Sequence, residues 1–301
     1  MAEDPNWPRA SAWLAGEHDP DPVARLAVLG APVRMGSLSR GRFDLAPEAV
    51  RAALHRFSTY DIETGVDVRT VATHDEGDLP LADSSPEDAL TPLAGAVGGT
   101  LDAIDAVVVL GGDNSVTRPG VRGLGPDLGA VGLLTLDAHF DLRHTDAGLN
   151  NGNPVRALLE DGLPGENVVQ IGIQGFANSA AYAAVATSAG ITVVTAETVH
   201  AQGIEPVVAG ALEHLAERAD RLYVDVDLDV LDRAHAPACP GARPGGLHPA
   251  QLRQATRLAG RHRKVRGMDV VEVDPTQDVS DVTVLTAASC LLAFAAGMAA
   301  R

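Results

Sequence analysis

Short apolar runs rich in β-branched residues recur along the chain, and they constrain its fold more than any other feature. Each run is bounded by Gly, Asp or Pro, which is typical of strands buried on both faces. The sequence therefore predicts buried strands within residues 25–33, 106–110, 131–136, 167–173, 191–196, 221–228 and 265–273.

Helix-like segments lie between these runs. Ser85 precedes Pro86, a good helix start, and Gly190 is a good helix stop. Strand–helix alternation predicts a single three-layer α/β/α domain with a mostly parallel, doubly wound sheet. We expect this domain to span residues 21–301, after an N-terminal extension of residues 1–20. The predicted helices cover residues 47–57, 84–97, 178–190, 205–219 and 249–261.

Composition restricts the partners and the compartment. Lys and Arg total 23 against 40 Asp and Glu, so the formal charge is −17 and nucleic acid is not an expected partner. The two cysteines, Cys239 and Cys290, form no disulfide framework or CxxC motif, which favours a cytoplasmic location. Residues 282–300 carry no charge but contain few large apolar side chains, so they predict a buried final helix and no membrane partner.

Polar clusters follow four of the predicted strands. They are GGDNSVT (111–117), DAHFDLRH (137–144), DLDVLD (227–232) and VEVDPTQD (271–278). In open α/β sheets, ligands bind beyond the carboxyl ends of the strands. These clusters therefore mark the expected site.

The clusters after two of the strands have the composition of a metal site. Asp137, His139 and Asp141 occupy alternate positions, which would place them on one face of an extended strand. Together with Asp227 and Asp229 they bring four carboxylates to one crevice, where two divalent cations would balance the repulsion. Oxygen ligands with one imidazole favour Mn²⁺. A lone DxHxD is often only structural, but a second acidic cluster favours the metal hypothesis.

The ordered set GGDNS (111–115), DAHFD (137–141) and DLDVLDRAHAPACPGARPGG (227–246) resembles the metal motifs of the ureohydrolases: arginases, agmatinases and formimidoylglutamases. The resemblance implies a three-layer α/β/α fold, a homo-oligomer and two Mn²⁺ per subunit that activate a bridging hydroxide. Carried over by position, Asp137 and Asp227 would bridge both ions. The remaining implied ligands are Asn114 and Asp141 for one ion, and His139 and Asp229 for the other.

Two positions depart from the family pattern. Asn114 stands where most relatives have histidine, and its amide oxygen is a poorer donor, so we expect a weaker metal site there. Alternatively, Asn114 serves a turn of its loop. Val155 stands where arginases carry a histidine proton shuttle, which argues against arginase itself.

Finer motifs favour one branch of the family. DAHFDLR (137–143) and GIQGFANS (172–179) are similar to formimidoylglutamases. The resemblance implies hydrolysis of N-formimidoyl-L-glutamate to L-glutamate and formamide in histidine degradation. Glu272 matches the acidic residue that meets the amidine-like nitrogen, and Asp141 is the expected proton carrier, with His144 as a second candidate.

The substrate's carboxylates require cations. Arg143 and Arg156 are the candidates, although each arginine could instead pair with a surface acid. Asn178 is a further candidate contact. Two alternatives stay open: a guanidino hydrolase that releases urea (an agmatinase or a guanidino-acid hydrolase), and a metal-poor relative without activity. Arg143 counts against a cationic substrate such as agmatine, and five intact ligand positions count against the inactive relative.

Overall fold

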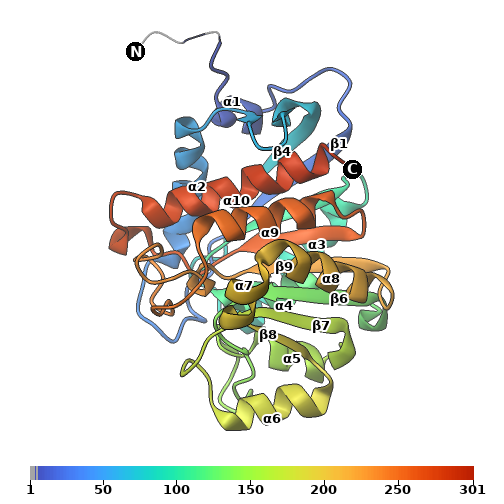
Figure 1. The fold of residues 1–301 in the computed structure, drawn as a ribbon, viewed down its shortest axis with the longest axis vertical. Coiled ribbons are helices and arrows are strands. Elements are labelled where there is room, and N and C mark those ends of the chain that lie inside the picture. The colour runs from blue at the N-terminus through green and yellow to red at the C-terminus, as the bar shows by residue number, and fades with distance from the viewer. Residues whose placement is uncertain (1–3, 5) are drawn as a thin grey trace.

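The computed structural model describes residue 4 and residues 6–301, and a parallel eight-stranded sheet forms its centre (Figure 1). The strand order is β4-β1-β5-β10-β9-β6-β7-β8. The predicted α/β fold with a parallel sheet is confirmed. The strands are β1 (Ala24–Ala31), β4 (Val71–Asp78), β5 (Ala106–Gly111), β6 (Val131–Leu136), β7 (Val168–Ile173), β8 (Thr192–Thr195), β9 (Arg221–Val226) and β10 (Val265–Val270).

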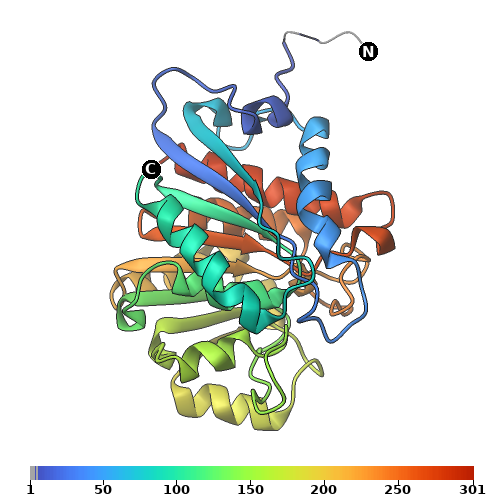
Figure 2. The same ribbon diagram turned by 180° about the vertical axis from the view of Figure 1, so that it is seen from behind.

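Helices cover both faces of the sheet and give three layers (Figures 1 and 2). On one face lie α2 (Ala46–Ala53), α7 (Ala196–Gln202), α8 (Ile204–Ala216), α9 (Pro249–Arg261) and α10 (Val282–Met298), whose apolar side chains share one core cluster. On the other face lie α3 (Pro86–Leu101), α4 (Thr117–Arg122), α5 (Pro154–Glu160) and α6 (Ala180–Ala189), which share a second cluster. The sheet therefore separates two hydrophobic cores.

The polar strand β4 is missing from the sequence prediction. It forms one edge of the sheet beside β1, where no further strand pairs with it. Its C-terminal part, HDEGD, is polar, as is common for an edge strand. Arg51 of α2 pairs there with Asp75 at 2.9 Å and with Asp78. The antiparallel pair β2 (Tyr60–Asp61) and β3 (Val66–Asp67) is a second small sheet.

The chain before residue 21 contributes to the core. The helix α1 (Ala10–Leu14) carries Trp13, which is fully buried and donates its indole N–H to the Val71 carbonyl at 2.9 Å. The domain boundary at residue 21 stays a prediction, but part of the predicted extension packs against β4.

The final helix α10 is buried, as its composition predicted. It packs against α9, and a side chain at Gly297 or Gly260 would overlap the backbone of the other helix. These two glycines therefore allow the helices to approach closely. Within the described residues, no helix has the length and apolarity needed to cross a membrane.

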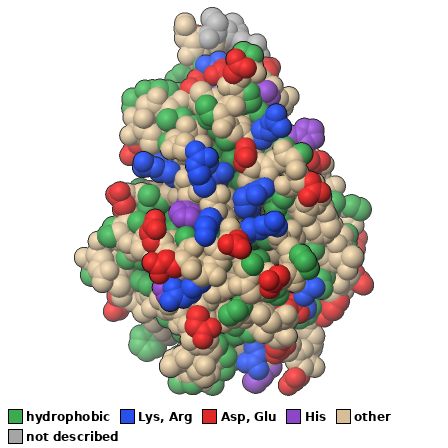
Figure 3. All heavy atoms as spheres, turned by 90° about the vertical axis from the view of Figure 1, so that its right-hand side faces the viewer, with side chains coloured by type: hydrophobic (Ala, Val, Ile, Leu, Met, Phe, Trp, Pro, Cys, Tyr) green, Lys and Arg blue, Asp and Glu red, His purple; other side chains and the backbone are tan. Residues whose placement is uncertain are grey.

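Lys and Arg side chains gather on the face where the strands begin (Figure 3). Several bind carbonyl groups at or just beyond helix C-termini, which parallel α/β connections bring to this face. Lys264 donates to the Ala216 and Ala219 carbonyls at the end of α8, at 2.8 and 3.0 Å. Arg266 donates to the Leu101 carbonyl at the end of α3, at 3.1 Å. Cations here satisfy exposed carbonyls and complement the helix dipoles, so this basic face has a structural explanation.

Replacing Lys264 with Met should lower the free energy of unfolding by about 1–2 kcal/mol, because two carbonyls at the end of α8 lose their donor. Urea denaturation measures this change. The control is Arg263→Met at the neighbouring exposed position, which should stay within about 0.5 kcal/mol of the wild type. Equal effects of the two substitutions would contradict the capping role of Lys264.

Candidate active site

Four neighbouring strands in the middle of the sheet deliver the candidate residues. The order β5-β10-β9-β6 places the segments after these strands side by side, although they are far apart in the sequence. A bridge between Asp227 and Val271 continues the pairing of β9 and β10 beyond the strands. The four polar clusters predicted from the sequence therefore meet at the carboxyl ends of these strands.

The segment 137–141 is a loop, which corrects the prediction that its alternate residues lie on a strand. The strand β6 ends at Leu136, and Asp141 adopts a left-handed backbone with φ of 53°. Asn178 holds this loop: its Oδ1 accepts from the Phe140 N–H and its Nδ2 donates to the Ala138 carbonyl, both at 2.9 Å. The side chain expected to contact substrate thus supports the loop, and it also lines the cavity.

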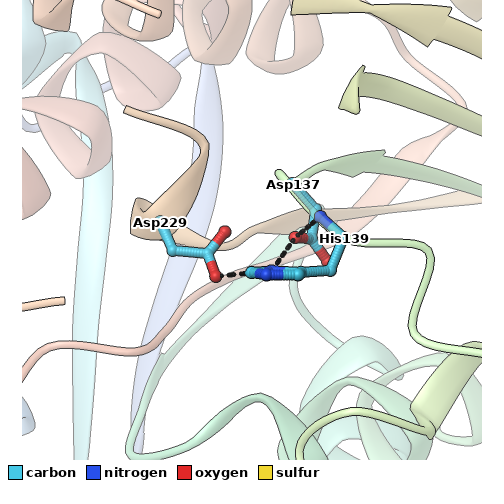
Figure 4. Close-up of side chains that lie close together, drawn as sticks. All are labelled: Asp137, His139 and Asp229. Atoms are coloured by element: carbon cyan, nitrogen blue, oxygen red, sulfur yellow. Dashed lines mark hydrogen bonds and ion pairs between the residues drawn. The ribbon is translucent and has the colours of Figure 1, made fainter. Parts of the chain in front are cut away.

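Asp137, His139 and Asp229 form a compact cluster (Figure 4). One potential ligand atom from each residue lies within 4.8 Å of the others. The His139 Nδ1 lies 2.8 Å from the Asp229 Oδ2 and 3.6 Å from the Asp137 Oδ1. This loop geometry brings together three of the six predicted ligands.

Asp227 and Asp141 complete the acidic floor, and both line the cavity beside His139. The Asp227 Oδ1 accepts from the Asp229 backbone N–H at 2.8 Å, which orients the Asp227 side chain. Asp141 is 7% and Asp227 is 3% exposed, so neither charge is well hydrated. The site therefore concentrates carboxylates where water cannot screen them.

Burial and mutual repulsion disturb the titration of this floor. Burial and the Asp229 charge raise the pKa of Asp137 to about 7. Burial and neighbouring carboxylates raise the pKa values of Asp141 and Asp227 well above the usual range. Burial opposes a charge on His139, yet Asp229 and Asp137 raise its pKa to about 11. The protein environment thus strongly favours added positive charge.

The donor set fits divalent cations. The Asp137 Oδ2 is buried without a hydrogen-bond partner, and such an orphaned carboxylate oxygen requires a cation or a proton. Carboxylate oxygens with a single imidazole suit a hard to borderline ion such as Mn²⁺. Asp137, His139, Asp141, Asp227 and Asp229 are the residues that would hold such ions.

Asn114 lies beside this floor. Its amide Nδ2 is 2.6 Å from the Asp141 Oδ2, and its Oδ1 is 2.6 Å from the Thr117 Oγ1. The Thr117 hydroxyl also lies 2.9 Å from the Asp269 Oδ2, and its single proton can serve only one of these acceptors. When Thr117 donates to Asp269, a flipped Asn114 amide would point its oxygen towards Asp141. The ligand role of Asn114 stays a prediction, which requires this flip and a cation between the amide oxygen and the Asp141 carboxylate.

Glu272 lies where the sequence predicted, at the cavity wall next to the acidic floor. Its backbone is left-handed, with φ of 65°, and its N–H donates to the Gly112 carbonyl at 3.0 Å. The Glu272 Oε1 accepts from the Asn114 N–H at 2.8 Å and from the Asn151 Nδ2 at 2.9 Å. Burial and the nearby Asp113 carboxylate raise the pKa of Glu272 to about 8.

A cavity of about 330 Å³ opens above the floor, and two arginines line it. Arg143 lines it, as predicted. Arg156 does not: its Nε donates to Glu160 one turn along α5, at 2.8 Å. His144 is exposed and does not line the cavity either. The second arginine of the lining is Arg243.

Sequence reasoning missed Arg243 and Asn151. Arg243 lies in the proline- and glycine-rich loop after β9, where no local pattern distinguishes it from other surface arginines. Asn151 lies in the segment NNGNPVR (150–156). This segment drew attention because Val155 stands where arginases carry the histidine proton shuttle, not because of Asn151 itself. Both residues reach the cavity through loop geometry.

The Arginase family model matches residues 24–297, and the chain belongs to the arginase family. It is 37% identical to a formimidoylglutamase of Halalkalibacterium halodurans over 90% of this chain and 86% of that protein. A solved formimidoylglutamase of Bacillus subtilis strain 168 superposes with a TM-score of 0.91 at 31% identity, over 99% of this chain and 94% of that one. The predicted family and the resemblance to formimidoylglutamases are confirmed.

A more distant solved structure shares the fold. It is a formiminoglutamase of Trypanosoma cruzi with Mn²⁺, with a TM-score of 0.87 at 24% identity over 98% of this chain and 99% of that one. The chain described here is therefore an arginase-family hydrolase with a small-molecule substrate.

The raised carboxyl pKa values predict how stability varies with pH in metal-free protein. These groups bind more protons in the folded than in the unfolded chain, so the free energy of unfolding should fall as pH rises. The decline should begin at about pH 4, where carboxyls titrate in the unfolded chain, and continue through about pH 8, the pKa of Glu272, towards the raised pKa of His139. Urea unfolding at pH 5 and pH 8, with chelator and with saturating Mn²⁺, measures it.

Mn²⁺ should remove the decline, because bound cations favour the ionised carboxylates. The control is Glu272→Gln, which lacks the group with a pKa of about 8 and should lose less stability between pH 6 and pH 8. Chelated wild-type protein that is as stable at pH 8 as at pH 5 would contradict this account of the site.

Replacing Asn114 with His should raise the affinity of the weaker site for Mn²⁺, on the order of tenfold, because imidazole is the better donor. Calorimetric titration of metal-free protein with Mn²⁺ measures the change. Asn114→Ala is the matched control and should weaken the same site. An Mn²⁺ titration that neither substitution alters would show that residue 114 is not a ligand.

Proposed function

We propose that the protein is a binuclear manganese hydrolase that converts N-formimidoyl-L-glutamate and water to L-glutamate and formamide. One observation carries the proposal: a buried carboxylate–imidazole cluster forms the floor of a cavity whose wall contains Arg143. The floor suits metal ions and the arginine suits an acidic substrate. Support comes from the similar formimidoylglutamases and from the relative solved with Mn²⁺.

The proposed ligands are Asp137, His139, Asp141, Asp227 and Asp229, with Asn114 as a sixth, weaker donor. Two divalent cations held there would supply Lewis acidity and lower the pKa of water enough for attack at neutral pH. Asp137 and Asp227, the residues that would hold both cations, are almost fully buried.

Glu272 is proposed to bind the formimidoyl group. The Asn114 N–H and the Asn151 amide fix its carboxyl group against the cavity wall. A carboxylate there would accept an N–H of the amidinium-like substrate as a charge-assisted hydrogen bond. The cationic group would also lower the pKa of Glu272 from about 8 and keep the carboxyl ionised.

Proton transfer is assigned to Asp141. It borders the cavity and the metal floor, so it can accept a proton from the attacking water and deliver it to the leaving amine of glutamate. His144 is exposed and outside the cavity lining, which makes it the weaker candidate.

A guanidino-acid hydrolase is the second candidate. Such a substrate keeps a carboxylate for Arg143 and replaces the formimidoyl group with a guanidino group that Glu272 also suits. An agmatinase is less compatible, since Arg143 would face a cationic tail.

The test is turnover by Mn²⁺-loaded protein of N-formimidoyl-L-glutamate, agmatine, arginine and short guanidino acids. We expect formamide and glutamate from the first compound only. Asp227→Ala should lower kcat/KM by about 10³-fold or more, because a shared metal ligand is lost. Urea from a guanidino acid would overturn the substrate, and wild-type turnover by the Asp227 variant would overturn the site.

A further inference from the structure

Two arginines of the cavity wall carry no carboxylate partner among the described residues. The Arg143 side chain makes no hydrogen bond or ion pair there, and its stem packs against Gly152, where a Cβ would lie 2.6 Å from the Arg143 Cδ. Arg243 donates only to backbone carbonyls, with Gly241 at 2.7 Å. Many arginines outside the cavity are ion-paired, such as Arg51 and Arg118. In a chain of charge −17, a guanidinium without a carboxylate is available for a ligand.

The two arginines reach the cavity from different loops. Arg143 lies two residues after Asp141, and its backbone N–H donates to the Gly152 carbonyl at 3.1 Å. Arg243 lies two residues after Gly241, which packs so closely on Asp229 that a Cβ there would overlap its carboxylate. Each loop therefore contacts the acidic floor and carries an arginine just beyond it.

We propose that Arg243 and Arg143 each bind one carboxylate of the substrate, so that the cavity selects a dicarboxylic acid. The inference rests on the proposed function and adds Arg243 as a specificity-determining residue. A substrate carboxylate needs a cationic partner in this acidic chain, and a guanidinium offers it two parallel N–H donors. A cavity of about 330 Å³ is large enough for an amino acid of glutamate size.

A purely structural role for Arg243 makes a different prediction. If its bond to the Gly241 carbonyl only holds the loop against Asp229, its loss would disturb the metal floor and slow every substrate alike. A carboxylate-binding role affects only substrates that carry that carboxylate. Substrate analogues therefore separate the two roles.

The experiment compares the wild type, Arg243→Gln, Arg143→Gln and the control Arg263→Gln, which lies on the opposite, strand-start face. The substrates are N-formimidoyl-L-glutamate and its analogues lacking the α-carboxylate (N-formimidoyl-4-aminobutanoate) or the side-chain carboxylate (N-formimidoyl-2-aminobutanoate). Arg243→Gln should lower kcat/KM on the glutamate derivative about 10- to 100-fold, as for loss of a charged hydrogen-bonded pair. It should lower kcat/KM by less than about threefold on one of the two analogues, and Arg143→Gln should show the reverse preference.

Equal losses on all three substrates, or no loss beyond that of the control, would overturn the role of Arg243. Glutarate binding to Mn²⁺-loaded protein separates this inference from the proposed function. If the wild type does not hydrolyse N-formimidoyl-L-glutamate, the proposed function fails. Arg243 then stands only if Arg243→Gln weakens glutarate binding tenfold or more while Arg263→Gln leaves it unchanged, and it falls if both variants bind glutarate like the wild type.

Discussion

Repulsion among buried carboxylates at the carboxyl ends of the central strands is the constraint on which the rest of the site depends. Asp137, Asp141, Asp227 and Asp229 lie almost out of contact with water, and in the part of the chain that the structure describes only His139 offers them an internal counter-charge. Such an arrangement is costly unless cations neutralise it. The raised pKa values of Asp137, Asp141 and Asp227 express this cost, and they also explain why an acidic floor can attract metal ions.

The interactions that stabilise the fold lie apart from these repelling carboxylates. Two hydrophobic cores on opposite faces of the sheet stabilise the domain, and cations at the other end of the strands satisfy the carbonyls of helix termini. Loops after the strands are therefore free to adopt unfavourable conformations such as the left-handed backbone of Asp141 and Glu272. Both of these residues face the cavity, as strained residues at functional sites commonly do.

The sequence predicted the parts of this molecule that follow periodic rules. Buried strands and capped helices have local signatures, as at Ser85, whose hydroxyl accepts from the Asp88 N–H, and at Gly190 with its left-handed φ of 81°. The polar edge strand β4 has no such signature. The directions of side chains were harder to predict. Arg156 lies in α5 and pairs with Glu160 one turn along this helix. Arg243 lines the cavity from a loop that has no periodic pattern.

The position of β10 ties the site to the order in which the chain is made. This strand is near the C-terminus, yet it inserts between β5 and β9, and it carries Glu272 just beyond its end. A growing chain that has already produced the DAHFD and DLDVLD segments still lacks the strand that fills the gap between β5 and β9. Long-range strand insertion of this kind is slow compared with local pairing. The wall that carries Glu272 and the contact between Asn114 and Asp141 should therefore form late in synthesis, after the segments that hold Asp137, His139, Asp227 and Asp229.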